Sequence, residues 1–130
     1  MTEGYSGTPQ LKKLGIKPGL RLVIEGRPDD WEFAEPLEGV ELVEAGPTDI
    51  ALVFVRSASQ IDFDRWGQWI FPSGSVWVAW PRKAAGHVSD VDENAIRNAA
   101  LELGLVDVKV AAIDTDWSGL KIVWRKENRG

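Results

Sequence analysis

Three segments with consecutive apolar residues divide the middle of this chain: 20–26 (LRLVIEG), 49–55 (DIALVFV) and 75–80 (SVWVAW). Successive residues of a strand point to opposite faces of its sheet, so consecutive apolar residues require both faces to be covered. Such coverage is typical of parallel sheets, whose crossover connections pack on both faces. The three segments therefore predict parallel strands.

Helical spacing of apolar residues follows the second and the third segment. The expected core positions are Phe63, Trp66 and Ile70 in a helix over 57–70, and Ile96, Ala99, Ala100 and Leu103 in a helix over 90–103. Ser57 with Gln60 fits a capping box for the first helix, and Asp90 with Glu93 fits one for the second. Strands that alternate with helices predict right-handed crossovers.

Two further strands, 106–114 and 120–126, are predicted at the end of the chain. The linker between them, TDWSG, is too short for a parallel crossover, so they should form an antiparallel hairpin. A weaker strand, 40–44, is followed by AGPT, which is also too short for a crossover to the strand at 49–55. The segment 40–44 is therefore expected to be either an antiparallel edge strand or an irregular extension.

These elements predict an α/β fold: a three-layer Rossmann-like sandwich with a mostly parallel sheet that ends in an antiparallel C-terminal hairpin. The length of 130 residues suits a single domain over 1–130. Residues 1–18 are expected to form an N-terminal extension with a short helix. In that helix Thr8 is the predicted N-cap, Pro9 the first helical residue and Gly15 the end.

Composition narrows the functional classes. The chain has no cysteine, which excludes disulfides, thiolate metal sites and cysteine nucleophiles. No run approaches the roughly 18–20 uncharged apolar residues of a membrane span. Met1 leads into TEGYSGTPQ, which has neither the basic start nor the apolar stretch of a secretory signal. We therefore expect a cytoplasmic protein without membrane association.

Charge is distributed unevenly around a formal total of −5. Residues 1–28 hold five Lys or Arg and two Glu, whereas residues 29–64 hold ten carboxylates and one Arg. A duplex-binding domain normally presents a net basic face to the phosphates. The distribution argues against general nucleic-acid binding, and the acidic middle is expected to be solvated surface.

Three stretches resemble class I S-adenosylmethionine-dependent methyltransferases. LGIKPGLRLVIEG is similar to the segment that leads into the first strand of that family, and FPSGSVWVAWPRK is similar to its L-x-P-G-G loop and the strand that follows. LGLVDVKVAAIDTDWSGLKIVWRK resembles its terminal hairpin. The resemblance implies that fold, with Gly26 and Glu44 as contacts to S-adenosylmethionine, Glu44 as the ribose-binding acid. Two features depart from the family. Its D/E-x-G-x-G-x-G loop corresponds here to Glu25–Asp30, which has one glycine and then a proline, and AGPT replaces a helix, a strand and another helix.

Four motifs more closely resemble a family of small bacterial proteins classified as a domain of unknown function: GYSGTPQLKKLGIKPG, WVAWPRK, DENAIR and GLVDVKVAAIDTDWSGLK. The motifs follow the family's order over nearly the full length of the chain. This resemblance supports the fold and implies no activity, cofactor or catalytic residue.

Ligands of doubly wound sheets bind outside the carboxyl ends of the strands. This rule points to four loops, which follow residues 26, 55, 80 and 114. In the third loop, Arg82 and Lys83 could hold an anion beside Trp80 and close to the start of the 90–103 helix. The alternative is that Trp80 belongs to the core and that both cations are solvated.

The turn of the C-terminal hairpin offers four further candidate ligand contacts: Asp114, Asp116, Trp117 and Ser118. Paired carboxylates could serve as acid and base or hold a divalent ion. The alternatives are that they form the turn, cap a strand, or pair with Arg82 or Lys83 in the neighbouring loop.

Several functions stay open at this stage. His87, the single histidine, is expected to be an exposed loop residue, and Trp31 joins Trp117 as a loop tryptophan able to contact a ligand or partner. The main hypothesis is a non-catalytic binding module for a protein partner or an anionic small molecule, without cofactor or metal. The alternative is a degenerate S-adenosylmethionine-dependent methyltransferase. A hydrolase or lyase that works through Asp114 and Asp116 is a third hypothesis.

Overall fold

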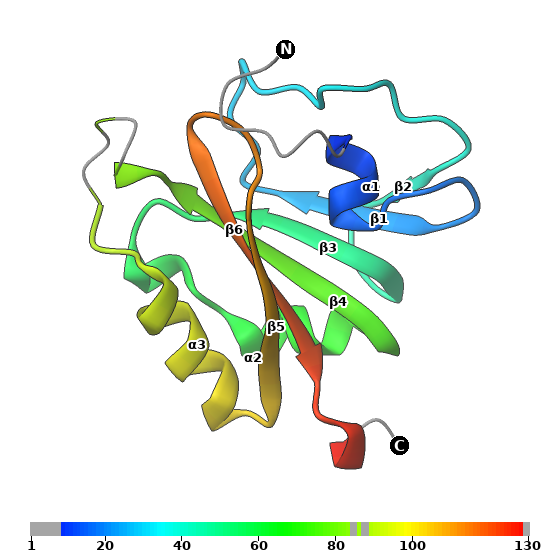
Figure 1. Ribbon diagram of the computed structural model, residues 1–130. Helices are drawn as coiled ribbons and strands as arrows, with labels where there is room; N and C mark the ends of the chain where they lie inside the picture. The colour runs from blue at the N-terminus through cyan, green and yellow to red at the C-terminus, as the bar shows by residue number, and fades with distance from the viewer. Residues whose placement is uncertain (1–8, 84–85, 87–88, 129–130) are drawn as a thin grey trace.

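The computed structural model describes residues 9–83, 86 and 89–128. In this part of the chain six strands form one sheet, in the order β2-β1-β3-β4-β6-β5 (Figure 1). The strands are β1 (Arg21–Glu25), β2 (Glu41–Val43), β3 (Thr48–Phe54), β4 (Ile70–Pro81), β5 (Leu105–Ala112) and β6 (Trp117–Trp124). The helices are α1 (Gln10–Leu14), α2 (Phe63–Trp69) and α3 (Glu93–Glu102), with short 3₁₀ turns η1 (Ala58–Gln60) and η3 (Lys126–Asn128).

The sheet is mostly parallel. β1 is parallel to β2 and to β3, and β3 is parallel to β4. β6 is antiparallel to both of its neighbours, β4 and β5. The predicted α/β fold with an antiparallel C-terminal hairpin is confirmed. None of the described helices has the length and hydropathy needed to cross a bilayer.

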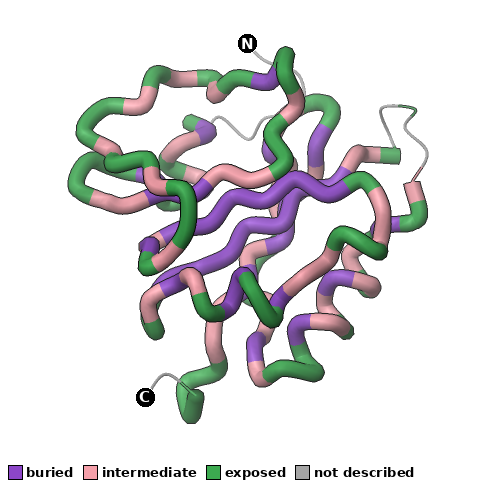
Figure 2. The backbone as a smooth tube through the Cα atoms, turned by 180° about the vertical axis from the view of Figure 1, so that it is seen from behind, coloured by how far each residue is buried: buried purple, intermediate pink, exposed green. Residues whose placement is uncertain are grey.

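Two apolar clusters cover the two faces of the sheet. On the helical face, α2 packs on β3 and β4 and α3 packs on β5 and β6, around Trp66 and Ile96. On the strap face, α1 and the extended segment 26–40, which we call the strap, close over Leu52 and Trp77. In Figure 1 α2 and α3 lie together at lower left, and α1 and the strap lie at upper right. Figure 2 shows β3 buried between these layers along nearly its whole length.

The helix predicted over 57–70 divides in two. The predicted capping box closes η1, and extended backbone at Ile61 then interrupts the helix. α2 begins after Asp62, whose carboxylate accepts a hydrogen bond from the backbone N–H of Arg65. The helix is therefore only seven residues long, and Ile70 reaches the core as the first residue of β4.

α3 lies where it was predicted but has a different N-cap. Asp92 accepts a hydrogen bond from Ala95 N at 2.9 Å, whereas the predicted cap, Asp90, accepts one from Ala58 N at 2.9 Å in the preceding turn. Leu103 is 40% exposed because the helix ends there, so its predicted place in the apolar stripe is wrong.

α1 is the predicted short helix near the N-terminus. It begins after Pro9, which occupies the N-cap position rather than the first helical position, and it ends at Gly15, whose φ is +79°. Thr8, the predicted cap, lies outside the described residues. The carbonyl of buried Leu14 accepts a hydrogen bond from Trp77 Nε1 at 3.0 Å, which ties the helix to β4.

The pairing of β2 differs from both alternatives predicted for 40–44. β2 is parallel to β1, so it is neither an antiparallel edge strand nor an irregular extension. The strap makes the crossover from β1 to β2 without a helix, and residues 44–47 then carry the chain past β1 to β3. This short link runs against α2, where a Cβ on Gly46 would lie 2.3 Å from the Trp69 carbonyl oxygen.

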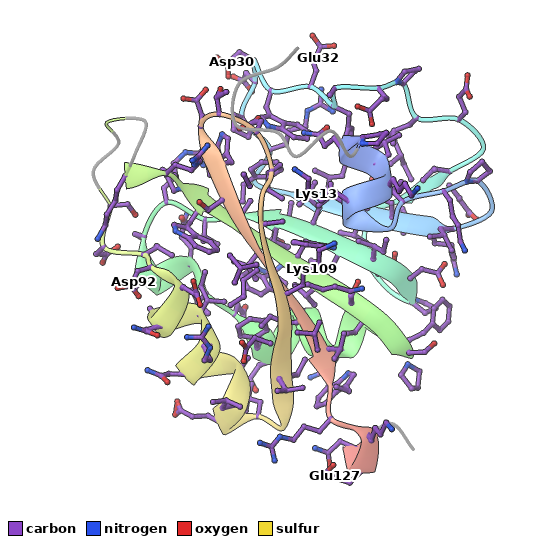
Figure 3. The ribbon with its side chains drawn as sticks, viewed as in Figure 1. Lys13, Asp30, Glu32, Asp92, Lys109 and Glu127 are labelled. Atoms are coloured by element: carbon purple, nitrogen blue, oxygen red, sulfur yellow. The ribbon has the colours of Figure 1, made fainter. Side chains whose placement is uncertain are left out.

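The C-terminal hairpin contains a register shift at Val108. The residues on either side of the shift make contacts on opposite faces of the sheet. Asp107 accepts a hydrogen bond from Arg97 of α3 at 3.0 Å, and the Lys109 ammonium reaches the Lys13 carbonyl of α1 at 3.4 Å (Figure 3). The extra residue bends the strand and interrupts its hydrogen-bond ladder.

Candidate ligand site at the strand ends

An open cavity of about 490 Å³ lies outside the carboxyl ends of β3 and β4. We call it the strand-end hollow. It is lined by residues of the strap, of the β3 and β4 ends and of the β5–β6 turn: Pro28, Asp30, Trp31, Glu32, Arg56, Pro81, Asp114, Asp116 and Trp117. Its volume lies within the roughly 300–1,000 Å³ of small-molecule sites, and its position is the one at which doubly wound sheets bind ligands.

Asp114 organises the wall of the hollow formed by the β5–β6 turn. Its Oδ1 accepts hydrogen bonds from the backbone N–H groups of Asp116 and Trp117, both at 2.9 Å. Its Oδ2 accepts a hydrogen bond from Trp31 Nε1 of the strap at 2.7 Å. Three donors therefore hold one carboxylate, which closes the turn and fastens the strap to it. Within the described residues, no three His, Asp or Glu side chains are placed to hold a metal ion.

A row of aromatic rings forms the floor between the strap and the turn. Trp31 meets Phe33 and Phe54 edge to face, at centroid distances of 4.8 and 5.0 Å. Phe54 in turn meets Trp117 at 5.0 Å. Trp31 is 5% exposed and Trp117 is 9% exposed, so both tryptophans predicted to contact a ligand are mainly core residues that show one edge to the hollow.

Among the described lining residues Arg56 is the single cation, and Val55 separates it from the end of β3. Its guanidinium lies over the Trp117 ring, 5.5 Å from the centroid. Its backbone N–H donates to the Gln60 side chain, and its carbonyl accepts a hydrogen bond from Ser89 Oγ at 2.7 Å. The main chain at this position is thus fixed from two sides while the side chain is exposed.

Arg82 holds the β5–β6 turn through hydrogen bonds to its backbone. Its backbone N–H donates to the Asp116 carbonyl at 2.8 Å, and its Nη1 donates to the carbonyls of Asp114 and Thr115 at 3.2 and 3.4 Å. It contacts the predicted neighbouring loop, but through carbonyl oxygens and not through the carboxylates of an ion pair. Arg82 therefore positions the wall of the hollow.

Besides Trp31, the structure brings three of the predicted candidates into the hollow, and it leaves the other described candidates outside. Asp114, Asp116 and Trp117 line it together. Trp80 belongs to the core of the helical face, where it is 8% exposed, and Ser118 pairs with it on β6 and is half-buried. Lys83 is exposed and not part of the lining. His87 lies outside the described residues.

The residues that follow β1 do not fit S-adenosylmethionine in the position that the glycine-rich loop gives it in the methyltransferase pattern. Both carboxylate oxygens of Glu25, the acid of that pattern, accept hydrogen bonds from Arg65, and Oε2 also accepts one from Trp66 Nε1 at 3.0 Å. The hydrogen bonds from Arg65 to Glu25, and then to Asp62, raise the pKa of Arg65. The Glu25 carboxylate is thus occupied by hydrogen bonds from α2.

The turn after Glu25 is closed by its own backbone. Trp31 N donates to the Pro28 carbonyl at 3.1 Å, and Arg27 Nε donates to the Trp31 carbonyl at 3.0 Å. Gly26 has a φ of +73°, and a Cβ there would lie 2.5 Å from the Phe54 carbonyl oxygen, so glycine serves the contact between β1 and β3.

Neither of the two predicted cofactor contacts lines the strand-end hollow. Gly26 lies in the turn after β1, and Glu44 is exposed beyond β2. The candidate site therefore lies at the ends of β3 and β4 and at the hairpin turn, and not at these two residues.

Sequence reasoning missed Arg56, Asp30 and Glu32 as lining residues. Arg56 carried a usable signal, because it is the first residue after the most apolar predicted strand, 49–55, and stands at the edge where ligands bind. Asp30 and Glu32 carried no signal in the sequence that pointed to the site. They belong to a strap without periodicity, whose path depends on contacts with distant segments.

No protein-family model and no curated protein sequence matches the chain. Among solved structures, the ribosomal protein L11 methylase from Lactobacillus delbrueckii subsp. bulgaricus is similar with a TM-score of 0.52 and 13% identity, over 89% of this chain and 75% of that one. LepI in complex with SAM is similar with a TM-score of 0.51 and 9% identity, over 88% of this chain and 39% of LepI. A structure described as a pericyclic reaction enzyme gives the same values.

At these identities the likeness shows the fold alone. The methyltransferase-like fold implied by the sequence resemblance is confirmed. The resemblance to a small bacterial family is not tested by these comparisons and stays a prediction.

Proposed function

We propose that this protein is a degenerate methyltransferase that has kept a ligand site at the carboxyl edge of its sheet and binds a cationic small molecule there. S-adenosylmethionine is the ligand to test first, because a structure of similar fold, LepI, is a complex with that compound. The observation that carries the proposal is the strand-end hollow, an open space whose described lining has four carboxylates and one guanidinium.

The charges of the lining favour a cation. The described residues that line the hollow include four carboxylates and one guanidinium, so their formal charge is negative. S-adenosylmethionine has a sulfonium and an ammonium group against one carboxylate, and so carries a net positive charge. The same lining disfavours the anionic small molecule of the main sequence hypothesis, because multiply charged phosphates would meet like charges.

The proposal is confined to binding. The loop after β1 does not fit the cofactor in the family's usual position, and the Asp114 carboxylate is already held by three N–H donors. A carboxylate in that state is a poor candidate for a base. No transfer step follows from the residues that line the hollow, so ligand binding is the function proposed.

Isothermal titration calorimetry and thermal unfolding, followed by tryptophan fluorescence, test the proposal with three compounds. We expect S-adenosylmethionine to bind more tightly than S-adenosylhomocysteine, which lacks the sulfonium charge, and ATP not to bind. A ligand at 100 times its Kd adds about 2.7 kcal/mol to the free energy of unfolding, which raises the Tm by several degrees.

A charge variant locates the binding. Asp30→Asn combined with Glu32→Gln should weaken S-adenosylmethionine about three- to tenfold, because two nearby charges are lost. Glu38→Gln, which removes an exposed strap carboxylate outside the hollow, is the matched control and should leave the Kd unchanged. Equal binding by the double variant and the wild type, or no binding of either adenosyl compound, would contradict the proposal.

A further inference from the structure

We infer that the strand-end hollow recognises an α-amino acid head group, and that Arg56 binds the carboxylate of the ligand. The ligand class is then an amino acid that carries a second cationic group. This inference rests on the proposed function and adds the chemistry that selects the ligand.

Within the described residues, the Arg56 side chain forms no ion pair. Four carboxylates line the same hollow, yet in the described part of the chain none lies within 4.0 Å of the Arg56 guanidinium, which lies over the Trp117 ring instead. An arginine beside carboxylates would be expected to pair with one of them. The donors of this guanidinium thus stay available to a ligand in the hollow.

Arg56 is also held in advance of binding. Ser89 Oγ donates to its carbonyl at 2.7 Å, and the Gln60 side chain accepts a hydrogen bond from its backbone N–H. The two backbone donors that follow are also bound, Ser57 N by the Gln60 side chain at 3.1 Å and Ala58 N by Asp90 at 2.9 Å. With the main chain fixed and the guanidinium placed over the Trp117 ring, the side chain loses little freedom when it binds an anion. Its planar fork matches a carboxylate with two parallel hydrogen bonds.

The strap contributes the opposite charge to the lining. Asp30 and Glu32 are exposed lining residues, and Figure 3 shows both pointing outward from the strap. The hollow therefore offers a cationic group at the end of β3 and carboxylates on the strap. A ligand with a carboxylate and separate positive groups satisfies both, whereas a diamine would place a cation against Arg56.

Decarboxylated S-adenosylmethionine is the decisive probe, because it keeps the adenosyl, sulfonium and amino groups and lacks only the carboxylate. Titration calorimetry should compare it with S-adenosylmethionine on the wild type, Arg56→Met and Arg56→Lys. We expect the wild type to bind S-adenosylmethionine about tenfold or more tightly than the decarboxylated form, since a hydrogen-bonded charge pair is lost. Arg56→Met keeps an apolar stem over Trp117 and should remove this preference, and Arg56→Lys should retain part of it.

Lys83→Met is the matched control, because it removes an exposed cation outside the hollow and should keep the preference of the wild type. Equal or tighter binding of the decarboxylated form to the wild type would overturn the inference while the proposed function stands. Binding of neither adenosyl compound would overturn both. Unchanged thermal unfolding of Arg56→Met and Arg56→Lys without ligand shows that altered affinities do not reflect loss of the fold.

Discussion

The helical face and the strap face of the sheet each bury an apolar cluster, but the two layers are assembled differently. On the helical face, α2 and α3 place regularly spaced residues such as Trp66 and Ile96 against the strands. On the strap face, a five-residue helix and an irregular segment cover the strands with residues that have no regular spacing, such as Leu14 and Trp31. Periodic side chains define the first layer, so its geometry follows from the helix repeat.

The strap face depends instead on polar side chains that reach distant backbone groups. Buried Gln10 donates to the Ile113 carbonyl at 2.8 Å and accepts a hydrogen bond from Ala34 N at 2.7 Å. Glu35 of the strap accepts a hydrogen bond from Leu11 N at 2.8 Å. These bonds join α1, the strap and the β5–β6 turn. An irregular layer leaves its backbone groups without the internal partners of a helix, so polar side chains from distant segments must supply them.

The largest effect is expected on the helical face. Trp66→Ala should lower the free energy of unfolding by about 3–5 kcal/mol, because Trp66 is fully buried and the surroundings collapse only in part around the cavity. Urea unfolding measures the loss. Trp69→Ala on the same helix is the control: Trp69 is half-buried under Arg65, so its loss should be clearly smaller. Equal losses would show that the helical face is not organised around Trp66.

An intermediate effect is expected at the centre of the strap face. Gln10→Leu keeps the size of the side chain but leaves the Ile113 carbonyl and the Ala34 N–H without partners, which should cost about 2–3 kcal/mol. Urea unfolding measures the cost, and hydrogen exchange should show faster exchange at Ala34. Lys12→Leu changes an exposed position of the same helix and should have little effect. A neutral Gln10→Leu would mean that packing alone holds this face.

The smallest effect concerns the bond that fastens the strap to the hairpin turn. A double-mutant cycle of Trp31→Phe and Asp114→Asn should give a coupling free energy of about 1.5 kcal/mol, as expected for a partly buried hydrogen bond to a carboxylate. Unfolding in urea provides the four free energies. A coupling close to zero would contradict the role of this bond, whatever the single variants cost.

The sequence predicted the elements whose signal is local. The apolar segments at β1, β3 and β4 and the short TDWSG linker are sufficient for a parallel sheet with a C-terminal hairpin, and Asp114, Asp116 and Trp117 could be placed at its ligand edge. The pairing of β2 could not be predicted, because it depends on a crossover without a helix.

The residues of the site were predictable only in part, because side-chain directions and the path of the strap depend on contacts between distant segments. Trp80 lies on the helical face, although the rule about strand ends directed attention to its loop. Side-chain direction decides which of two adjacent residues enters the hollow, and Pro81 does so in place of Trp80. Asp30 and Glu32 reach the hollow through the path of the strap, which polar contacts with distant residues determine.

The register shift at Val108 also governs how copies of the molecule can meet. β5 is an outer strand, and Val108 and Val110 on it are 55% and 50% exposed, which would suit sheet growth by edge-to-edge addition. The extra residue prevents a straight incoming strand from aligning its hydrogen bonds along the whole edge, and Lys109 places a charge there. The irregular β5 edge thus disfavours aggregation by strand addition.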